Sequence, residues 1–176
     1  MRYAGVDASL TNTGIAVYDT ASAEYSITSV PSTSSGNLLS ERGNRLEKIA
    51  SKVLDFIGTD VELVAIEGPA FSSNTGKVWD RAGLWWYIVK LLIREGIEVV
   101  EIPPTTRAKY ATGKGNAGKD EVLLAVSRGY PLADIKNNDE ADAVVMCAIA
   151  ARLAGSPIEE DLPKTKLDAM LKLEKD

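Results

Sequence analysis

The first 30 residues contain three short segments with the alternating apolar pattern of β-strands, separated by only a few polar residues. The segments are 3–8, 13–18 and 24–30, and in the second of them Ile15 and Val17 fall on one face. Connections this short favour strands that run back and forth beside one another. The sequence therefore predicts a three-stranded antiparallel meander at the N-terminus.

Helices and strands alternate along the rest of the chain. An apolar stripe at helical spacing predicts a helix over 40–57, with Ser40 as its N-cap and Gly58 as its stop. The other expected elements are strands at 61–66 and 97–102, helices at 76–94, 119–128 and 138–153, and a helical turn at 105–110. This order predicts a mixed α/β domain over 1–156 and a charged tail over 157–176, whose apolar residues have helical spacing.

The residue types that are missing exclude several kinds of active site. The chain has no histidine, which rules out a Ser-His-Asp triad, a Cys-His pair and an HExxH zinc site. Its single cysteine, Cys147, lies in an apolar run, and we expect it to be buried in a reducing compartment. Any metal must therefore bind to oxygen ligands, which favours Mg²⁺, Mn²⁺ or Ca²⁺.

Charge and hydropathy indicate which binding partners and which compartment to expect for the protein. Its 20 basic and 25 acidic side chains give a net charge of −5 at pH 7, which argues against binding to DNA or a membrane by bulk charge alone. Basic residues that contact phosphates would have to gather on one face. The first residues lack the apolar run of a signal peptide, and no apolar stretch approaches the roughly 20 residues of a membrane span. We expect a soluble, cytoplasmic protein with no membrane partner.

Four acidic residues stand where an acid is costly unless it has a function. Asp7 falls within an apolar strand, Glu67 ends another, and Asp139 and Asp142 share one face of a helix. Each has an ordinary explanation by itself, namely a turn, a strand end or the helix dipole. Together, half-buried carboxylates repel one another unless a cation joins them. Two divalent metals about 4 Å apart would neutralise them, activate a water and bind a phosphate.

Residues 103–119 form a basic segment in an otherwise acidic chain. The segment contains no acid and includes a glycine-rich loop at 113–118. Glycines let backbone N–H groups approach phosphates, and basic side chains neutralise them. The candidate DNA contacts in this segment are Arg107, Lys109, Lys114 and Lys119. A mobile solvated loop explains the same composition equally well.

Four short motifs of this chain resemble those of the RuvC-type Holliday junction resolvases, which belong to the ribonuclease H-like superfamily. The motifs are Gly5–Gly14, Ile66–Pro69, Gly113–Lys119 and Asp139–Ala143, and the match extends from about residue 1 to residue 153. The resemblance implies an α/β, ribonuclease H-like fold with a central five-stranded mixed sheet, antiparallel in its first three strands and flanked by helices. It also implies a bacterial or phage-encoded homodimer that cuts symmetric strands of a four-way DNA junction.

The same resemblance implies roles for individual residues. The metal-binding and catalytic acids fall on Asp7, Glu67, Asp139 and Asp142, with two Mg²⁺ or Mn²⁺ ions per active site. Lys119 supports the scissile phosphate as a further catalytic residue. A second basic residue of the family falls on Ala108, between two basic neighbours that can replace it.

The polar loop after Glu67 and the helix that follows it also have implied roles. An aromatic residue beside a phosphate site can stack on an unpaired base. The candidate DNA contacts of this loop are Phe71, Asn74 and Lys77. A hydrophobic staple for the following helix explains the aromatic residue as well. In the family the helix equivalent to 76–94 forms the dimer interface, and Trp79 and Trp86, seven residues apart, share one of its faces.

Three other functions fit some of these residues. The same acids would serve a ribonuclease H-like nuclease that cuts flaps or RNA–DNA hybrids. The Asp7–Gly14 segment also resembles the first phosphate loop of actin-like and sugar-kinase ATPases, but these proteins have two lobes and a glycine where Ser9 stands. A non-cleaving dimer that binds junctions is the third, and the presence of all four acids argues against it. We expect no nucleotide cofactor.

Overall fold

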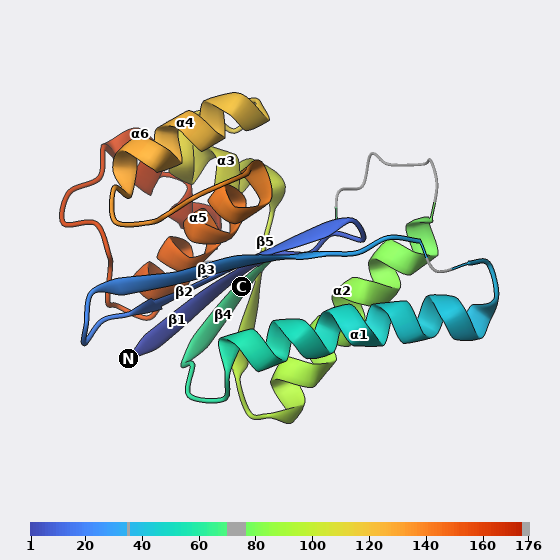
Figure 1. Cartoon of the computed structure of the whole chain (residues 1–176). Coiled ribbons are helices and arrows are strands. Elements are labelled where there is room, and N and C mark those ends of the chain that lie inside the picture. The colour runs from blue at the N-terminus through green and yellow to red at the C-terminus, as the bar shows by residue number, and fades with distance from the viewer. Residues whose placement is uncertain (35, 70–76, 174–176) are drawn as a thin grey trace.

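A five-stranded mixed sheet runs through the centre of the molecule (Figure 1). The computed structural model describes residues 1–34, 36–69 and 77–173. The strands are β1 (Arg2–Asp7), β2 (Asn12–Asp19), β3 (Glu24–Pro31), β4 (Leu63–Glu67) and β5 (Glu98–Ile102), in the order β3-β2-β1-β4-β5. The first three are antiparallel, and β4 and β5 continue the sheet in parallel with β1. This topology confirms the predicted fold.

Helices connect and cover the strands. They are α1 (Leu39–Ile57), α2 (Val78–Arg94), α3 (Pro104–Thr112), α4 (Lys119–Gly129), α5 (Asn138–Leu153), α6 (Lys164–Leu167) and the 3-10 turn η1 (Met170–Lys172). The prediction of Ser40 as the N-cap of α1 is wrong. The N-cap is Leu38, two residues earlier, and its backbone N–H donates to the Glu41 carboxylate at 3.1 Å. The expected turn at 105–110 is a full helix that begins with Pro104, since a proline at the first helical position needs no hydrogen bond.

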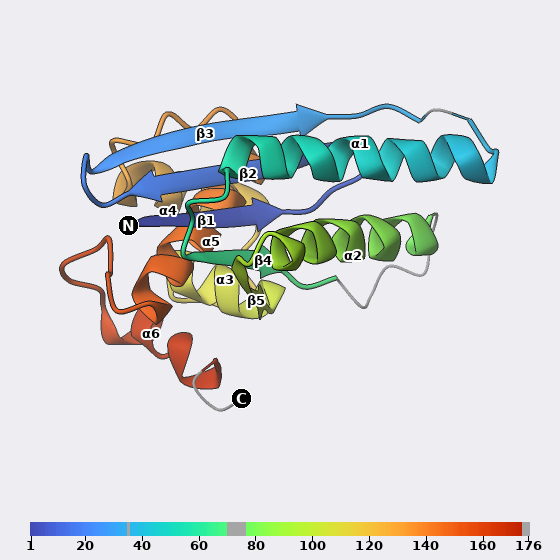
Figure 2. The same ribbon diagram turned by 90° about the horizontal axis from the view of Figure 1, so that it is seen from below.

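The helices form a layer on each side of the sheet. Helices α1 and α2 pack side by side on one face, and α3 to α6 cover the other (Figures 1 and 2). Because side chains alternate along a strand, β1 sends Ala4 and Val6 into the core beneath α1 and α2 and Tyr3 into the core beneath α5. An ion pair between Arg42 and the buried Asp80 joins α1 to α2, and it lowers the pKa of the Asp80 carboxyl through hydrogen bonding and charge.

Helix α5 lies unusually close to the sheet because two glycines remove the side chains that would hold it away. A Cβ atom at Gly5 would lie 2.1 Å from the carbonyl oxygen of Ala143, and one at Gly14 would lie 2.0 Å from that of Asp139. Residues 140–151 of α5 are all buried. The start of this apolar helix is therefore fixed directly over the ends of β1 and β2.

The segment after residue 156 packs against α3 and α5. Ala169 and Met170 are buried, and the Glu159 carboxylate accepts hydrogen bonds from Tyr110 and Tyr130 and forms an ion pair with Arg152. The predicted domain boundary at residue 156 stays a prediction. Within the described ranges, no helix is long and apolar enough to span a membrane.

Candidate active site

Asp7 and Glu67 lie side by side at the carboxyl ends of two neighbouring parallel strands. In the register of β1 and β4, Val6 pairs with Ile66, so the acids that follow occupy equivalent positions. Both extend the strand faces that point toward α5, as Tyr3 in β1 and Ala65 in β4 show. Behind them, the indole Nε1 of Trp85 donates a 3.0 Å hydrogen bond to the carbonyl oxygen of Glu67 and fixes the end of β4.

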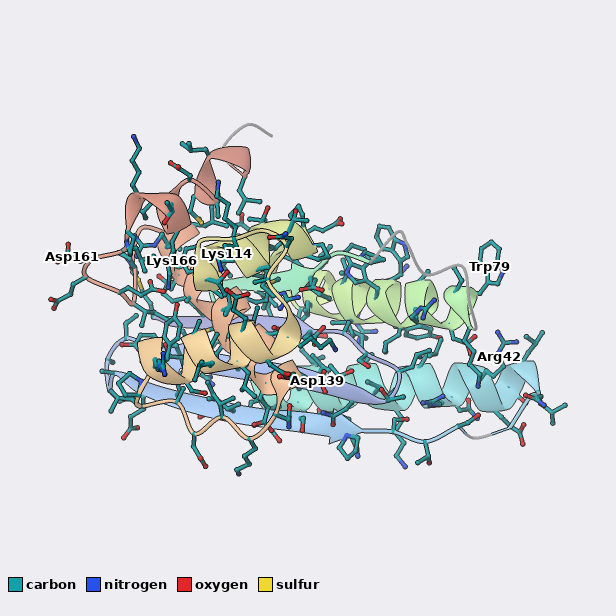
Figure 3. The ribbon with its side chains drawn as sticks, turned by 90° about the horizontal axis from the view of Figure 1, so that it is seen from above. Arg42, Trp79, Lys114, Asp139, Asp161 and Lys166 are labelled. Atoms are coloured by element: carbon teal, nitrogen blue, oxygen red, sulfur yellow. The ribbon has the colours of Figure 1, made fainter. Side chains whose placement is uncertain are left out.

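Helix α5 brings the other two acids over these strand ends. Asn137 caps the helix by accepting the backbone N–H of Glu140 at 2.9 Å, and Asp139 and Asp142 follow in its first turns. Asp142 is buried, with 4% of its surface exposed. Figure 3 shows Asp139 at the start of α5, above the sheet. Gly14, which pairs with Asp7, lies against the Asp139 backbone, so the close approach of α5 brings the strand acids and helix acids together.

Burial and mutual repulsion dominate the electrostatics of these acids. Burial, followed by the negative charges of Glu67, Asp142 and Asp139, raises the pKa of Asp7 to about 8. Burial also raises the pKa of Asp142 to about 6 and raises that of Glu67, while the positive charge of Arg107 opposes both shifts. The site therefore holds more negative charge than its surroundings compensate.

Arg107 is the basic side chain inside this group of acids. It begins in the first turns of α3, next to the end of β5, and its guanidinium pairs with Asp142 through Nη1 and with Glu67 through Nε. The pair with Asp142 is a hydrogen bond, whereas Arg107 Nε and Glu67 Oε2 are too poorly aligned to form one. The sequence predicts Arg107 as a DNA contact, and the structure instead places it between two of the candidate metal ligands.

Asn12 makes a contact with the site that sequence reasoning missed. Its Nδ2 donates a 2.7 Å hydrogen bond to Oδ2 of Asp139, across 127 residues of sequence. The only signal in the sequence is the position of Asn12 within the Gly5–Gly14 motif, where it reads as a turn residue. Asn12, the first residue of β2, thus orients Asp139 on α5.

Of the remaining predicted DNA contacts, Lys119 acts on two of the acids, and the others have no contact with the four acids or lie outside the described residues. Lys119, at the start of α4, is exposed, and its charge lowers the pKa of Glu67 and Asp142 as a smaller influence than burial and Arg107. Lys109 is half-buried, and the exposed Lys114 pairs with Glu121 at 2.9 Å. Lys77 is exposed and donates to Ser34 at 3.0 Å. Phe71 and Asn74 lie outside the described residues.

The acids have the chemistry that a divalent metal needs, although they are not gathered around one point. All four donors are carboxylates, which suit Mg²⁺ and Mn²⁺. Oε2 of Glu67 is buried in contact with Arg107 Nε and has no hydrogen-bond partner among the described residues. Over the same residues, no three acids converge closely enough to hold an ion as they stand. The residue types fit a metal site, and Arg107 pairs with two of its four acids.

Helix α2 exposes several large apolar side chains. Trp79 is 84% exposed and Trp86 is 63% exposed, whereas Trp85 between them is buried. Trp79 projects into solvent at the end of the helix (Figure 3). Beside them, a groove of about 530 Å³ between α1 and α2 is lined by Gly83, Trp86 and Tyr87, among others. This exposed surface agrees with the shared face predicted for Trp79 and Trp86.

Comparison with known proteins places the chain in a family. Residues 3–151 match the family model described as crossover junction endodeoxyribonuclease RuvC. The RuvC of Synechococcus sp. (strain WH7803) is 35% identical over 152 residues, which cover 83% of this chain and 95% of that protein. The RuvC of Rickettsia bellii (strain RML369-C) is 30% identical over 145 residues, covering 81% and 91%.

Solved structures agree on the fold. Thermus thermophilus RuvC superposes with a TM-score of 0.68 at 20% identity, over 89% of this chain and 98% of that one. The T. thermophilus RuvC in complex with a Holliday junction substrate gives a TM-score of 0.66 at 19% identity. The family match, the identity to curated relatives and the shared fold lead to one conclusion: the chain belongs to the RuvC family of crossover junction endodeoxyribonucleases.

Proposed function

We propose that this chain is a divalent-metal-dependent endonuclease that hydrolyses phosphodiester bonds at four-way DNA junctions by symmetric nicking. The observation that carries the proposal is the placement of Asp7 and Glu67 at neighbouring strand ends beneath the start of α5, which carries Asp139 and Asp142. Burial and the charges of the other three acids raise the pKa of Asp7 to about 8. The family membership supports the reaction, and the complex of T. thermophilus RuvC with a Holliday junction supports the substrate.

The four acids would hold Mg²⁺ or Mn²⁺, two ions per site, which when bound polarise a phosphate and supply an activated water. The residues of the chain do the positioning. Asp7 and Glu67 are fixed by the sheet, and the Asn12 hydrogen bond orients Asp139. With no histidine in the chain, no imidazole serves as a general base. Lys119, exposed beside the acids, offsets the negative charge that develops on the phosphate.

Four lysines would contact the DNA backbone. Lys109, Lys114 and Lys119 come from the segment that follows β5, and Lys77 comes from the start of α2. Since the chain as a whole is acidic, these local contacts must supply the phosphate binding that overall charge does not. Phe71 and Asn74 complete the set of proposed DNA contacts, with Phe71 stacking on an unpaired base at the junction.

We also propose that the active form is a homodimer joined through α2. Exposed tryptophans are costly on a monomer and common in interfaces, and Trp79 and Trp86 are the most exposed aromatic residues of this helix. A two-fold dimer would place two active sites in the symmetry of a junction. Sedimentation of the wild-type chain and of Trp86→Glu tests this: a dimer that dissociates in the variant supports the interface, and a wild-type monomer at micromolar concentration contradicts it.

A substrate panel tests the proposed reaction. The purified chain is incubated with a mobile four-way junction, a flap, an RNA–DNA hybrid and a linear duplex, each with Mg²⁺, Mn²⁺ or EDTA. Paired nicks in the junction alone, absent in EDTA, are expected. Preferential cleavage of the flap or hybrid would support the proposed active site but contradict the proposed substrate. Junction binding without cleavage in either metal would make the protein a binding module and contradict the catalytic roles.

A further inference from the structure

We infer that Arg107 is the resident cation of the carboxylate site, and that it competes with divalent metal for Glu67 and Asp142. The guanidinium pairs with these two acids, which come from different elements, β4 and α5. Metal binding then exchanges one cation for another at the same oxygens. The inference rests on the proposed function, because it takes the acids to be metal ligands.

The burial of Arg107 marks it as part of the site and not of the DNA-binding surface. Its side chain is 11% exposed, and those of Glu67 and Asp142 are 16% and 6% exposed. By contrast, Lys119, whose charge also acts on Glu67 and Asp142, is exposed. An arginine that contacts DNA phosphates would be exposed in the same way. Arg107 instead forms ion pairs with acids that would otherwise be buried without a counterion.

The pairing is incomplete, which leaves the site open to exchange. Arg107 Nε and Glu67 Oε2 lie in contact without hydrogen-bond alignment, and neither has another hydrogen-bond partner among the described residues. One guanidinium pairs with two carboxylates, Glu67 and Asp142. A single positive charge therefore compensates the acids only in part. Divalent ions carry more charge to the same oxygens and would displace it.

The position of Arg107 in the fold makes this exchange local. Its helix, α3, is anchored by buried Thr106, Ala108 and Tyr110 and packs on α5 and α6. The helix therefore need not move when the guanidinium leaves, because an arginine side chain reorients by bond rotation. Arg107 thus stabilises the metal-free fold and sets how much metal is needed to load the site.

Metal binding measured without DNA tests the competition. Mn²⁺ is titrated by calorimetry into the full chain as wild type, Arg107→Gln and Arg128→Gln. Arg128 is an exposed arginine on α4, so it controls for loss of one positive charge. We expect Arg107→Gln to bind Mn²⁺ at least 10-fold more tightly than wild type, and Arg128→Gln to match wild type. Thermal melts should show that Arg107→Gln is less stable in EDTA and gains more from Mn²⁺.

Several results would overturn the inference. Unchanged or weaker Mn²⁺ binding by Arg107→Gln, while wild type binds, contradicts the competition and leaves the proposed nuclease function standing. An equal gain in Mn²⁺ affinity in Arg128→Gln would show that the effect comes from the overall charge of the protein. No Mn²⁺ binding by any variant, wild type included, would contradict the metal-dependent function as well. Should Arg107→Gln fail to fold, Arg107→Lys keeps the charge without the two-armed fork, and competition then predicts tighter Mn²⁺ binding than in wild type.

Discussion

Gly14 lies directly against the backbone of Asp139, where a Cβ atom would come within 2.0 Å of the carbonyl oxygen. Gly14 also pairs with Asp7 across β1 and β2. One glycine thus links an acid of the sheet to an acid of α5, and the spacing of the candidate metal ligands depends on the missing side chain.

Gly14→Ala should therefore damage both the fold and the site. The added methyl group meets backbone that cannot move without shifting α5, and overpacking of this kind costs about 1–3 kcal/mol. Urea unfolding measures the loss. Gly43→Ala is the matched control, because nothing lies within 4 Å of a Cβ there and a helical alanine should stabilise α1 by about 0.5–1 kcal/mol. Equal effects of the two substitutions would contradict the close packing of α5.

Asn12→Ala should impair the site more than the fold. The variant loses the 2.7 Å hydrogen bond that orients Asp139, and loss of a group that orients a metal ligand typically costs 10–100-fold in metal affinity or activity. Mn²⁺ binding and junction cleavage measure the effect, with thermal melts to monitor folding. Thr11→Ala, at an exposed neighbour, is the control. Wild-type metal affinity in Asn12→Ala would show that Asp139 needs no orienting partner.

In the absence of metal, Asp7→Asn should stabilise the protein, and more so as the pH rises. The pKa of Asp7 is raised to about 8 by burial and the neighbouring acids, against about 3.9 in an unfolded chain. Between these values the folded state keeps a proton that the unfolded state has lost, so this group lowers stability progressively as the pH rises toward 8. Asparagine does not ionise and escapes this loss.

Thermal melts in EDTA at several values between about pH 4.5 and 8 check this sign. The Tm of Asp7→Asn should exceed that of wild type by a margin that widens across the range. Addition of Mg²⁺ should raise the Tm of wild type more than that of the variant. A Tm difference that stays constant or reverses in EDTA would show that the pKa of Asp7 is not raised in the folded protein.

Glu159→Ala should destabilise the chain strongly, because Glu159 joins the segment after residue 156 to the main core. Its carboxylate pairs with Arg152 at 3.0 Å and accepts from Tyr110 and Tyr130. Removing one partner of a buried ion pair costs about 3–5 kcal/mol. We propose on this basis that residues 157–173 belong to the same folding unit. Glu160→Ala, at an exposed neighbour, should change stability by less than about 0.5 kcal/mol. Similar small effects of the two substitutions on stability would contradict this proposal and indicate that the tail is not part of the domain.

Local patterns in the sequence predicted the elements and the four acids. The meander, the two further strands and α5 followed from apolar periodicity, and Asp7 and Glu67 were noticeable as acids at strand ends. Long-range contacts were not predictable in this way. The Asn12–Asp139 hydrogen bond joins residues 127 apart. Arg107 reads as a phosphate contact because its neighbours in sequence are basic, while its neighbours in space, on β4 and α5, are acids.

The central claim is that four carboxylates carry the chemistry, and single-turnover cleavage tests it most directly. A labelled four-way junction is saturated with wild type, Asp7→Asn, Glu67→Gln, Asp139→Asn or Asp142→Asn, and the reaction is started with Mg²⁺. We predict paired symmetric nicks with wild type, and rates at least about 100-fold lower in every variant that still binds the junction. Undiminished cleavage by Asp7→Asn, or by wild type in EDTA, would contradict the account.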